Sequence, residues 1–363
     1  MNRRTGYLLL LSLALSYGGE AQNKLQSPSG PAEQDLPIAI GLLLPDRSCS
    51  DVIEAAELAI DRANVSGGYM NREFSLVIRT AEGFWGAGSK ESVSLVYDDQ
   101  VSVIVGSLDG RNGHLAEQVT AKSHLTYIET YATEPTLSQA FVPWFMRVVP
   151  NDDQQAATIL HQINEDGGGK IAILTHDSYD TGFAVRSLTK AMALEYGVPP
   201  LVIRMDSKPI QQTQVIDKIL NSGIANLVIP FDAPYMEELI PLLKKADPEL
   251  KIYGTLHFTM DSQERNAPWN LYEGVCLVTP ASGNESAGFL SHCRPAYVSD
   301  AVDLVINAIR NVGTERQAIT DYIAGSEYRG AATGPISFDD MGNRLGDPAM
   351  CRIKNGIPVL LHR

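Results

Sequence analysis

The chain has 363 residues, with 29 Lys or Arg and 43 Asp or Glu, so its formal net charge is −14. Hydrophobic residues make up 44% and charged residues 20%, which excludes a mostly disordered chain because this composition supplies a large apolar core. The acidic surplus argues against a nucleic-acid-binding protein, whose surface must be positive toward phosphates. The length allows about two domains.

The first 21 residues have the organisation of a secretory signal peptide. Two arginines precede an apolar run over residues 8–15, which is too short to span a bilayer, and small residues precede a cleavage point after Ala21. We therefore predict a cleavable signal peptide over 1–21, export to the periplasm, and a flexible tether over 22–35. An uncleaved N-terminal anchor is the alternative.

The next part of the chain alternates short apolar runs with helical periodicity. Apolar positions of the first helix recur at spacings of three and four, and the two glycines after Ser66 supply the positive φ that ends it. We expect strands over 36–44, 74–80, 101–105 and 125–128, and helices over 53–63, 89–98 and 114–123.

The same alternation resumes after residue 150. Strands that are apolar along their whole length and alternate with helices indicate parallel sheets covered on both faces. We therefore predict an α/β protein with two doubly wound parallel-sheet lobes, which meet near 148–153. In this second part we expect helices over 154–165, 183–196, 213–222 and 235–245, strands over 170–175, 201–205, 225–231 and 251–256, and a tail of strands at 336–338, 350–353 and 358–361.

The sequence has no recognisable catalytic, cofactor or metal motif. The glycine-rich run 167–170 precedes a strand, whereas a phosphate-binding loop follows one. Cys49, Cys276, Cys293 and Cys351 match no metal-site spacing, and four cysteines allow three disulfide pairings that the sequence leaves open. A buried thiol is an equal interpretation for Cys276. We expect a binding protein with no enzyme activity, cofactor or metal.

Seven short segments support a resemblance when they are taken in order. They are 38–45 (IAIGLLLP), 55–60, 66–72 (SGGYMNR), 103–106, 131–135 (YATEP), 145–152 and 334–339 (GPISFD). Together they resemble type I periplasmic binding proteins, in particular the leucine/isoleucine/valine-binding group that serves ABC importers. The resemblance implies three hinge crossings between the lobes, with lobe one formed by 36–149 plus 279–334 and lobe two by 150–278 plus 335–363.

The resemblance also implies a function. A small-molecule ligand, expected to be an amino acid or a related small carboxylate, would be captured by lobe closure and delivered to an ABC permease in the inner membrane. We expect a monomer that does not bind nucleic acid. The alternative is a ligand-sensing module of the same fold that signals to a membrane receptor, and an exported α/β enzyme is a third hypothesis.

The candidate ligand contacts of lobe one lie in two loops that follow strands. Resemblance places Gly110 where relatives use a serine hydroxyl, and His114 is expected to begin the next helix. Thr133 matches a hydroxyl contact of the family, with a turn-capping threonine as the alternative. Asp109 and Arg111 are alternatively solvated loop residues. Arg47 is a candidate clamp for a carboxylate, and Trp85 is a candidate for the mouth of the cleft, with a surface anchor as the alternative. The lobe-one prediction is Leu108, Asp109, Gly110, Tyr131, Ala132 and Thr133.

The candidate contacts of lobe two are Tyr179, Phe231, Asp232 and His257. Tyr179 matches a tyrosine of a family signature in which Asp180 replaces a glycine. Asp232 is a candidate partner for an ammonium group, and a helix N-cap is the equal alternative. His257 lies where relatives place an acidic partner for the amine, and no Asp or Glu stands there.

Overall fold

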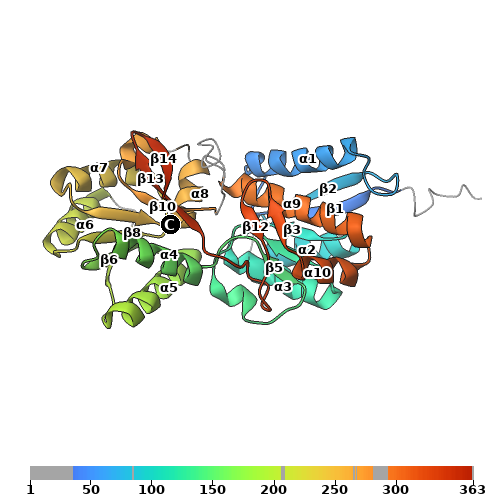
Figure 1. Ribbon diagram of the computed structural model, residues 1–363, viewed down its shortest axis with the longest axis horizontal. Coiled ribbons are helices and arrows are strands. Elements are labelled where there is room, and N and C mark those ends of the chain that lie inside the picture. The colour runs from blue at the N-terminus through green and yellow to red at the C-terminus, as the bar shows by residue number, and fades with distance from the viewer. Residues whose placement is uncertain are drawn as a thin grey trace, which may run out of the picture. The chain divides into compact units, whose positions relative to one another are not determined.

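The computed structural model describes residues 36–83, 86–205, 209–264, 266, 268–280 and 293–361. The predicted signal peptide and tether lie outside these ranges, as does Trp85, so these interpretations stay predictions. Within Pro37–Arg363, the strands form two large sheets and one small hairpin (Figure 1). In the part of the chain that is described, no helix is long and apolar enough to cross a membrane.

The sheet of lobe one is parallel throughout. Its order is β2 (Phe74–Thr80), β1 (Ile38–Leu44), β3 (Ile104–Gly106), β4 (Tyr127–Glu129) and β5 (Phe145–Arg147). Along β1, Ile38, Ile40 and Leu42 belong to one apolar core and Leu43 to another, because alternate side chains point to opposite faces. Both faces are therefore covered, as predicted. The helices of this lobe are α1 (Ser50–Val65), α2 (Ala87–Tyr97), α3 (Gly110–Ser123), α9 (Cys293–Val312) and α10 (Arg316–Ala324).

The sheet of lobe two combines parallel and antiparallel strands. Its parallel part runs β7 (Leu201–Arg204), β6 (Ile171–Thr175), β8 (Asn226–Ile229), β9 (Lys251–Gly254) and β10 (Cys276–Thr279). The tail adds the antiparallel strands β13 (Ala349–Lys354) and β14 (Ile357–Leu361). The helices are α4 (Asp152–Glu165), α5 (Tyr179–Tyr196), α6 (Pro209–Asn221), α7 (Met236–Ala246) and α8 (Leu256–Glu264), with single 3₁₀ turns at η2 (Pro135–Ser138) in lobe one and η3 (Trp269–Tyr272) in lobe two.

Several helices start earlier than the sequence predicts. Helix α3 begins at Gly110 and α5 at Tyr179, each four residues earlier than expected. Helix α8 was not expected and begins directly after the strand β9. The first turns of α3 and α5 are polar or glycine-rich, so apolar periodicity does not reveal them. Their caps do: Asp109 accepts the Asn112 N–H at 3.1 Å, and Ser178 caps α5 in the same way.

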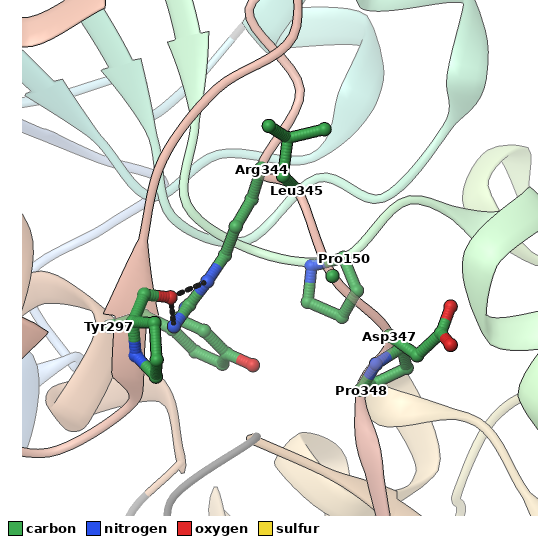
Figure 2. Close-up of a pocket in the computed structure, with 8 residues that line it drawn as sticks. Pro150, Tyr297, Arg344, Leu345, Asp347 and Pro348 are labelled. Carbon is green, nitrogen blue, oxygen red and sulfur yellow. Dashed lines mark hydrogen bonds between the residues drawn. The ribbon is translucent and has the colours of Figure 1, made fainter. Parts of the chain in front are cut away.

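The chain passes between the sheets through segments that we call the hinge, residues 147–151 and 333–346. Arg344 joins the two segments: its Nη1 donates to the Val148 carbonyl at 2.9 Å and its Nη2 to the Pro335 carbonyl at 2.6 Å. The second segment contains β12 (Gly334–Ile336), which pairs with β11 (Tyr328–Gly330) in the small hairpin. Figure 2 shows Arg344 beside a cavity of about 100 Å³ that Tyr297 and Asp347 also line.

Two of the four cysteines lie on neighbouring strands of lobe two. Cys276 on β10 and Cys351 on β13 are buried free thiols. The Cys276 sulfur accepts a hydrogen bond from Arg352 Nε at 3.0 Å, and burial raises the pKa of this thiol above its ordinary value. The buried-thiol interpretation of Cys276 is therefore confirmed.

Candidate functional site

The candidate site lies at the carboxyl ends of parallel strands from both sheets. In lobe one, residues 107–109 follow β3 and 130–134 follow β4; in lobe two, 176–178 follow β6, 230–235 follow β8, and Thr255 follows β9. Doubly wound sheets bind their ligands at this edge. Several side chains from these loops and from the helices after them contact one another across the two lobes.

Glu129 shapes the loop that carries Tyr131. This residue is fully buried at the end of β4, where its Oε1 accepts the backbone N–H groups of Thr130, Tyr131 and Ala132 at 2.9, 2.8 and 3.1 Å. Its Oε2 accepts the hydroxyl of Tyr127. Burial raises the pKa of Glu129 to about 7. The loop is thus held by one carboxylate that sequence reasoning did not identify.

Glu134 lies buried beside the first turn of α3. Its Oε1 is 2.7 Å from His114 Nε2 and accepts the Tyr179 hydroxyl of lobe two at 3.5 Å. Glu117 and Glu134 raise the pKa of His114 to about 9. His114 lies inside α3, so the expectation that it begins the helix is wrong. A Cβ atom on Gly110 would lie 2.7 Å from Glu134 Cδ, which leaves no room for the serine of relatives.

Tyr131 joins the lobes through its ring and its hydroxyl. The ring stacks on the His257 imidazole with centroids 4.9 Å apart and planes 15° apart, and the Arg294 guanidinium carbon lies 4.4 Å from the ring centroid. The hydroxyl donates to Asp261 Oδ1 at 3.3 Å. Arg294 is itself positioned by a hydrogen bond from its Nε to Ser107 Oγ at 2.9 Å. A cation beside an aromatic face stabilises this arrangement.

His257 is nearly fully buried in the first turn of α8. Its Nε2 lies 3.2 Å from the Tyr131 carbonyl oxygen and 3.5 Å from Thr133 Oγ1. Burial disfavours the imidazolium, but the carboxylates of Asp180 and Asp261 outweigh burial, so the pKa of His257 is raised above its ordinary value. A histidine with a raised pKa therefore lies near the place where the resemblance leads us to expect an acidic residue.

Asp180 makes a direct contact from lobe two to the start of α3. Its Oδ1 accepts the backbone N–H of Gly110, the first residue of α3, at 3.0 Å. Burial raises the pKa of Asp180. The neighbouring Tyr179 ring lies 5.1 Å from the Arg111 guanidinium carbon, so Arg111 also contacts lobe two. Arg111 is exposed, as the solvated interpretation expects, and it has this ring contact in addition.

Phe231 and Asp232 follow β8. The Phe231 ring stacks on His176 with centroids 3.9 Å apart. Asp232 Oδ1 accepts the Tyr272 hydroxyl at 3.1 Å. Helix α7 has Tyr235 at its N-cap, without a side-chain capping bond, so the N-cap alternative for Asp232 is wrong. Its role as an ammonium partner stays a prediction.

Some of the predicted residues make contacts between the lobes, whereas others only hold their own loops in place. Leu108 and Ala132 are fully buried in the core of lobe one and position their loops. Asp109 caps α3 and is not merely a solvated loop residue. Arg47 is exposed, and its backbone N–H donates to Glu82 Oε1 at 3.2 Å. The predicted residues that take part in contacts between the lobes are Gly110, Tyr131, Thr133, Tyr179 and His257.

Besides Glu129, sequence reasoning missed four further charged residues of this site. Glu134 occupies the variable position of the family's Ala-Thr-x-Pro loop, and Asp180 was noted only as a departure from a signature. Asp261 lies in the unexpected helix α8, and Arg294 lies far from Ser107 in sequence. Within the described ranges, no group of side chains is suited to hold a metal ion.

Comparison with known families identifies the class of protein that this fold and site define. Residues 37–286 match the model of a family described as "Periplasmic binding protein". The match covers more than half of the chain. The chain therefore belongs to the periplasmic binding protein family.

Solved structures show the same fold at low sequence identity. An ABC transporter substrate-binding protein from Desulfitobacterium hafniense, in complex with Leu, has a TM-score of 0.74 and 18% identity, and the match covers 90% of this chain and 100% of that chain. The branched-chain amino acid transporter substrate-binding protein LivJ from Streptococcus pneumoniae, in complex with isoleucine, has a TM-score of 0.72 and 17% identity over 90% and 99%. A solute-binding protein of an ABC transporter from R. palustris, in complex with benzoate, has a TM-score of 0.73 and 15% identity over 90% and 95%. The two-lobed α/β prediction is confirmed.

A curated protein also matches part of the chain. Glutamate receptor 3.7 of Arabidopsis thaliana is 23% identical over 188 residues, which is 49% of this chain and 20% of the receptor. The chain thus spans about a fifth of the length of that relative.

Proposed function

We propose that the chain is an extracytoplasmic solute-binding protein that captures a small molecule between its lobes and delivers it to an ABC importer. One observation carries the proposal: loops at the carboxyl ends of both sheets contact each other directly, through pairs such as Tyr131–His257 and Gly110–Asp180. Family membership supports the same reading. The predicted signal peptide would export the chain, and we propose that it acts as a monomer that hands its solute to an inner-membrane permease.

The class of solute follows from the side chains at this edge. Tyr131, His257, His176 and Phe231 form two aromatic stacks, which suit a small organic molecule with an apolar part. The relatives of the same fold were solved with Leu, isoleucine and benzoate. Amino acids and related small carboxylates are therefore the first class to test, together with their amides and amines.

Isothermal titration and thermal unfolding with such a panel test the proposal. A solute that binds only the folded protein, at about 100 times its Kd, stabilises it by about 2.7 kcal/mol and raises Tm by a few degrees. The solute should be recovered unchanged, since we propose binding and not catalysis. Absence of heat and of any Tm shift across amino acids, aromatic acids, amides and amines would contradict the proposal.

A sensing module of the same fold is the second candidate. The match to part of a plant receptor supports it, although that match covers only 20% of the receptor. Reconstitution separates the two: transport of a bound solute by vesicles that contain the permease encoded beside this gene favours the importer, whereas binding to a receptor ectodomain favours the sensor.

A further inference from the structure

The start of α3 is suited to bind a carboxylate, and the carboxylate of Asp180 already binds there. We call this position, at the backbone N–H of Gly110, the carboxylate seat. The first backbone N–H groups of a helix have no partner within the helix and carry partial positive charge. At α3, a helix of 14 residues, the N–H of Gly110 donates to Asp180 Oδ1 at 3.0 Å. Asp180 belongs to α5 of lobe two, so the carboxylate comes from across the site.

Asp180 is not needed to cap α3 for the stability of lobe one. Asp109 already performs that function within the lobe, since it accepts the Asn112 N–H at 3.1 Å and the Asn112 side-chain amide at 2.7 Å. Asp180 therefore adds a second carboxylate to a helix start that has its own cap. Its contribution is to hold the start of α3 and α5 together.

Glu134 lies beside the same seat and has one carboxylate oxygen that accepts no hydrogen bond from the described residues. The side chain is 1% exposed and packs where a Cβ of residue 110 would lie. Its Oε1 has His114 as a partner, whereas its Oε2 is buried without a hydrogen-bond partner among the described residues. A buried carboxylate oxygen without a donor is costly, so this position favours a group that donates an N–H.

The negative charges already present at the seat disfavour the binding of a further carboxylate. The carboxylates of Glu134 and Asp109 lie near enough to Asp180 to raise its pKa, in addition to the effect of burial. The carboxylates that the protein already has raise the pKa values of His257 and His114 beside them. A carboxylate brought by a solute would have to displace Asp180 or stand beside it.

We infer that Asp180 is a specificity-determining residue, which occupies the carboxylate seat at the start of α3 so that the site selects solutes ending in an amide or amine. This inference rests on the proposed function of the same site. Asp180 acts as a tethered carboxylate: it keeps the lobes in contact without solute and competes with any solute that carries a free carboxylate.

Two matched pairs of probes test the selectivity: leucine with leucinamide, and benzoate with benzamide. Titrations use the wild type, Asp180→Gly, which restores the glycine of the family signature, and Asp180→Asn, which keeps the size of the side chain. Asp177→Gly is the control, because Asp177 is exposed in the loop directly before α5 and pairs with Arg204. We expect the carboxylate-to-amide affinity ratio to rise about tenfold or more in both Asp180 variants, the effect of one charge-assisted hydrogen bond, and to stay unchanged in the control. An unchanged ratio in the Asp180 variants would overturn the inference.

A second measurement decides the inference even if no probe binds. Spin labels on cysteines introduced at Leu58 of α1 and Leu194 of α5, both exposed, report the distance between the lobes, while the four native cysteines are buried. Without solute, the wild type should give a narrow distribution and Asp180→Gly a broader one that extends to longer distances. Identical distributions would overturn the inference. Absence of binding by the wild type and both Asp180 variants across the whole panel would instead count against the proposed function.

Discussion

The hinge and the candidate site both connect the two lobes, but the contacts in them use different chemical groups. In the hinge, Arg344 donates to main-chain carbonyl oxygens of Val148 and Pro335. In the candidate site, the contacts use side chains: Asp180 accepts an N–H at the start of α3, and Tyr131 stacks on His257 and donates to Asp261. Main-chain carbonyls are present whatever the sequence, whereas a carboxylate can be lost by one substitution. The acceptors in the hinge are therefore independent of the sequence, although their donor Arg344 is not, whereas in the candidate site acceptors such as Asp180 and Asp261 are themselves side chains.

Arg147 offers the strongest way to break the hinge. It is fully buried, its Nη1 donates to the Glu134 carbonyl at 2.6 Å, and burial lowers its pKa to about 10. Arg147→Met should lower the free energy of unfolding by about 3–5 kcal/mol, because nearby carboxylates lose their buried cation. Urea denaturation measures the loss. Arg62→Met is the control, since the Arg62 side chain is 55% exposed and its pair with Asp303 should contribute less than about 1 kcal/mol.

Glu129, which holds the loop that carries Tyr131, makes the free energy of unfolding depend on pH. Its pKa in the folded protein is about 7, above the ordinary 4.5, so folding favours the protonated form. That contribution is complete below about pH 4.5 and is lost as pH rises through 7. Glu129→Gln cannot ionise, so its stability relative to the wild type should rise by up to about 3 kcal/mol between these pH values. A difference in unfolding free energy that stays constant from pH 4.5 to 8 would contradict this.

Substitutions of Tyr131 test how much its aromatic ring contributes to solute binding. Tyr131→Ala removes the stack on His257 and the contact with Arg294, and should weaken solute binding by about 1–2 kcal/mol. Tyr131→Phe keeps the ring and loses only the hydroxyl bond to Asp261, so it should cost about 1 kcal/mol or less. Titration with any solute that the wild type binds measures both. Equal losses in the two variants would show that the ring contributes nothing.

Asp109 offers the mildest test, because it acts within one lobe. Asp109→Ala removes the cap of α3 and should lower the unfolding free energy by about 1 kcal/mol, whereas Asp109→Asn should leave it nearly unchanged. Neither should alter the carboxylate-to-amide affinity ratio, in contrast to substitutions of Asp180. A changed ratio in Asp109→Asn would show that the two aspartates share one role.

The fold could be predicted from sequence because its signals are local. The apolar strand β1 and the glycines that end α1 are each read from a few neighbouring residues. Candidate loops followed from the order of strands and from a resemblance. The partners of Tyr131 could not be predicted in this way, because only tertiary packing brings Asp261 and Arg294 to it. The role of Asp180 likewise depends on a helix start 70 residues away in sequence.

The most direct test of solute capture by lobe closure is the spin-label distance between Leu58→Cys and Leu194→Cys in the Asp180→Gly background, with and without a solute that this variant binds. In this background the tethered carboxylate is gone, so closure must come from the solute. We predict that saturating solute shifts the distribution to shorter and narrower distances. A distribution that stays the same while titration shows the solute bound would contradict capture between the lobes.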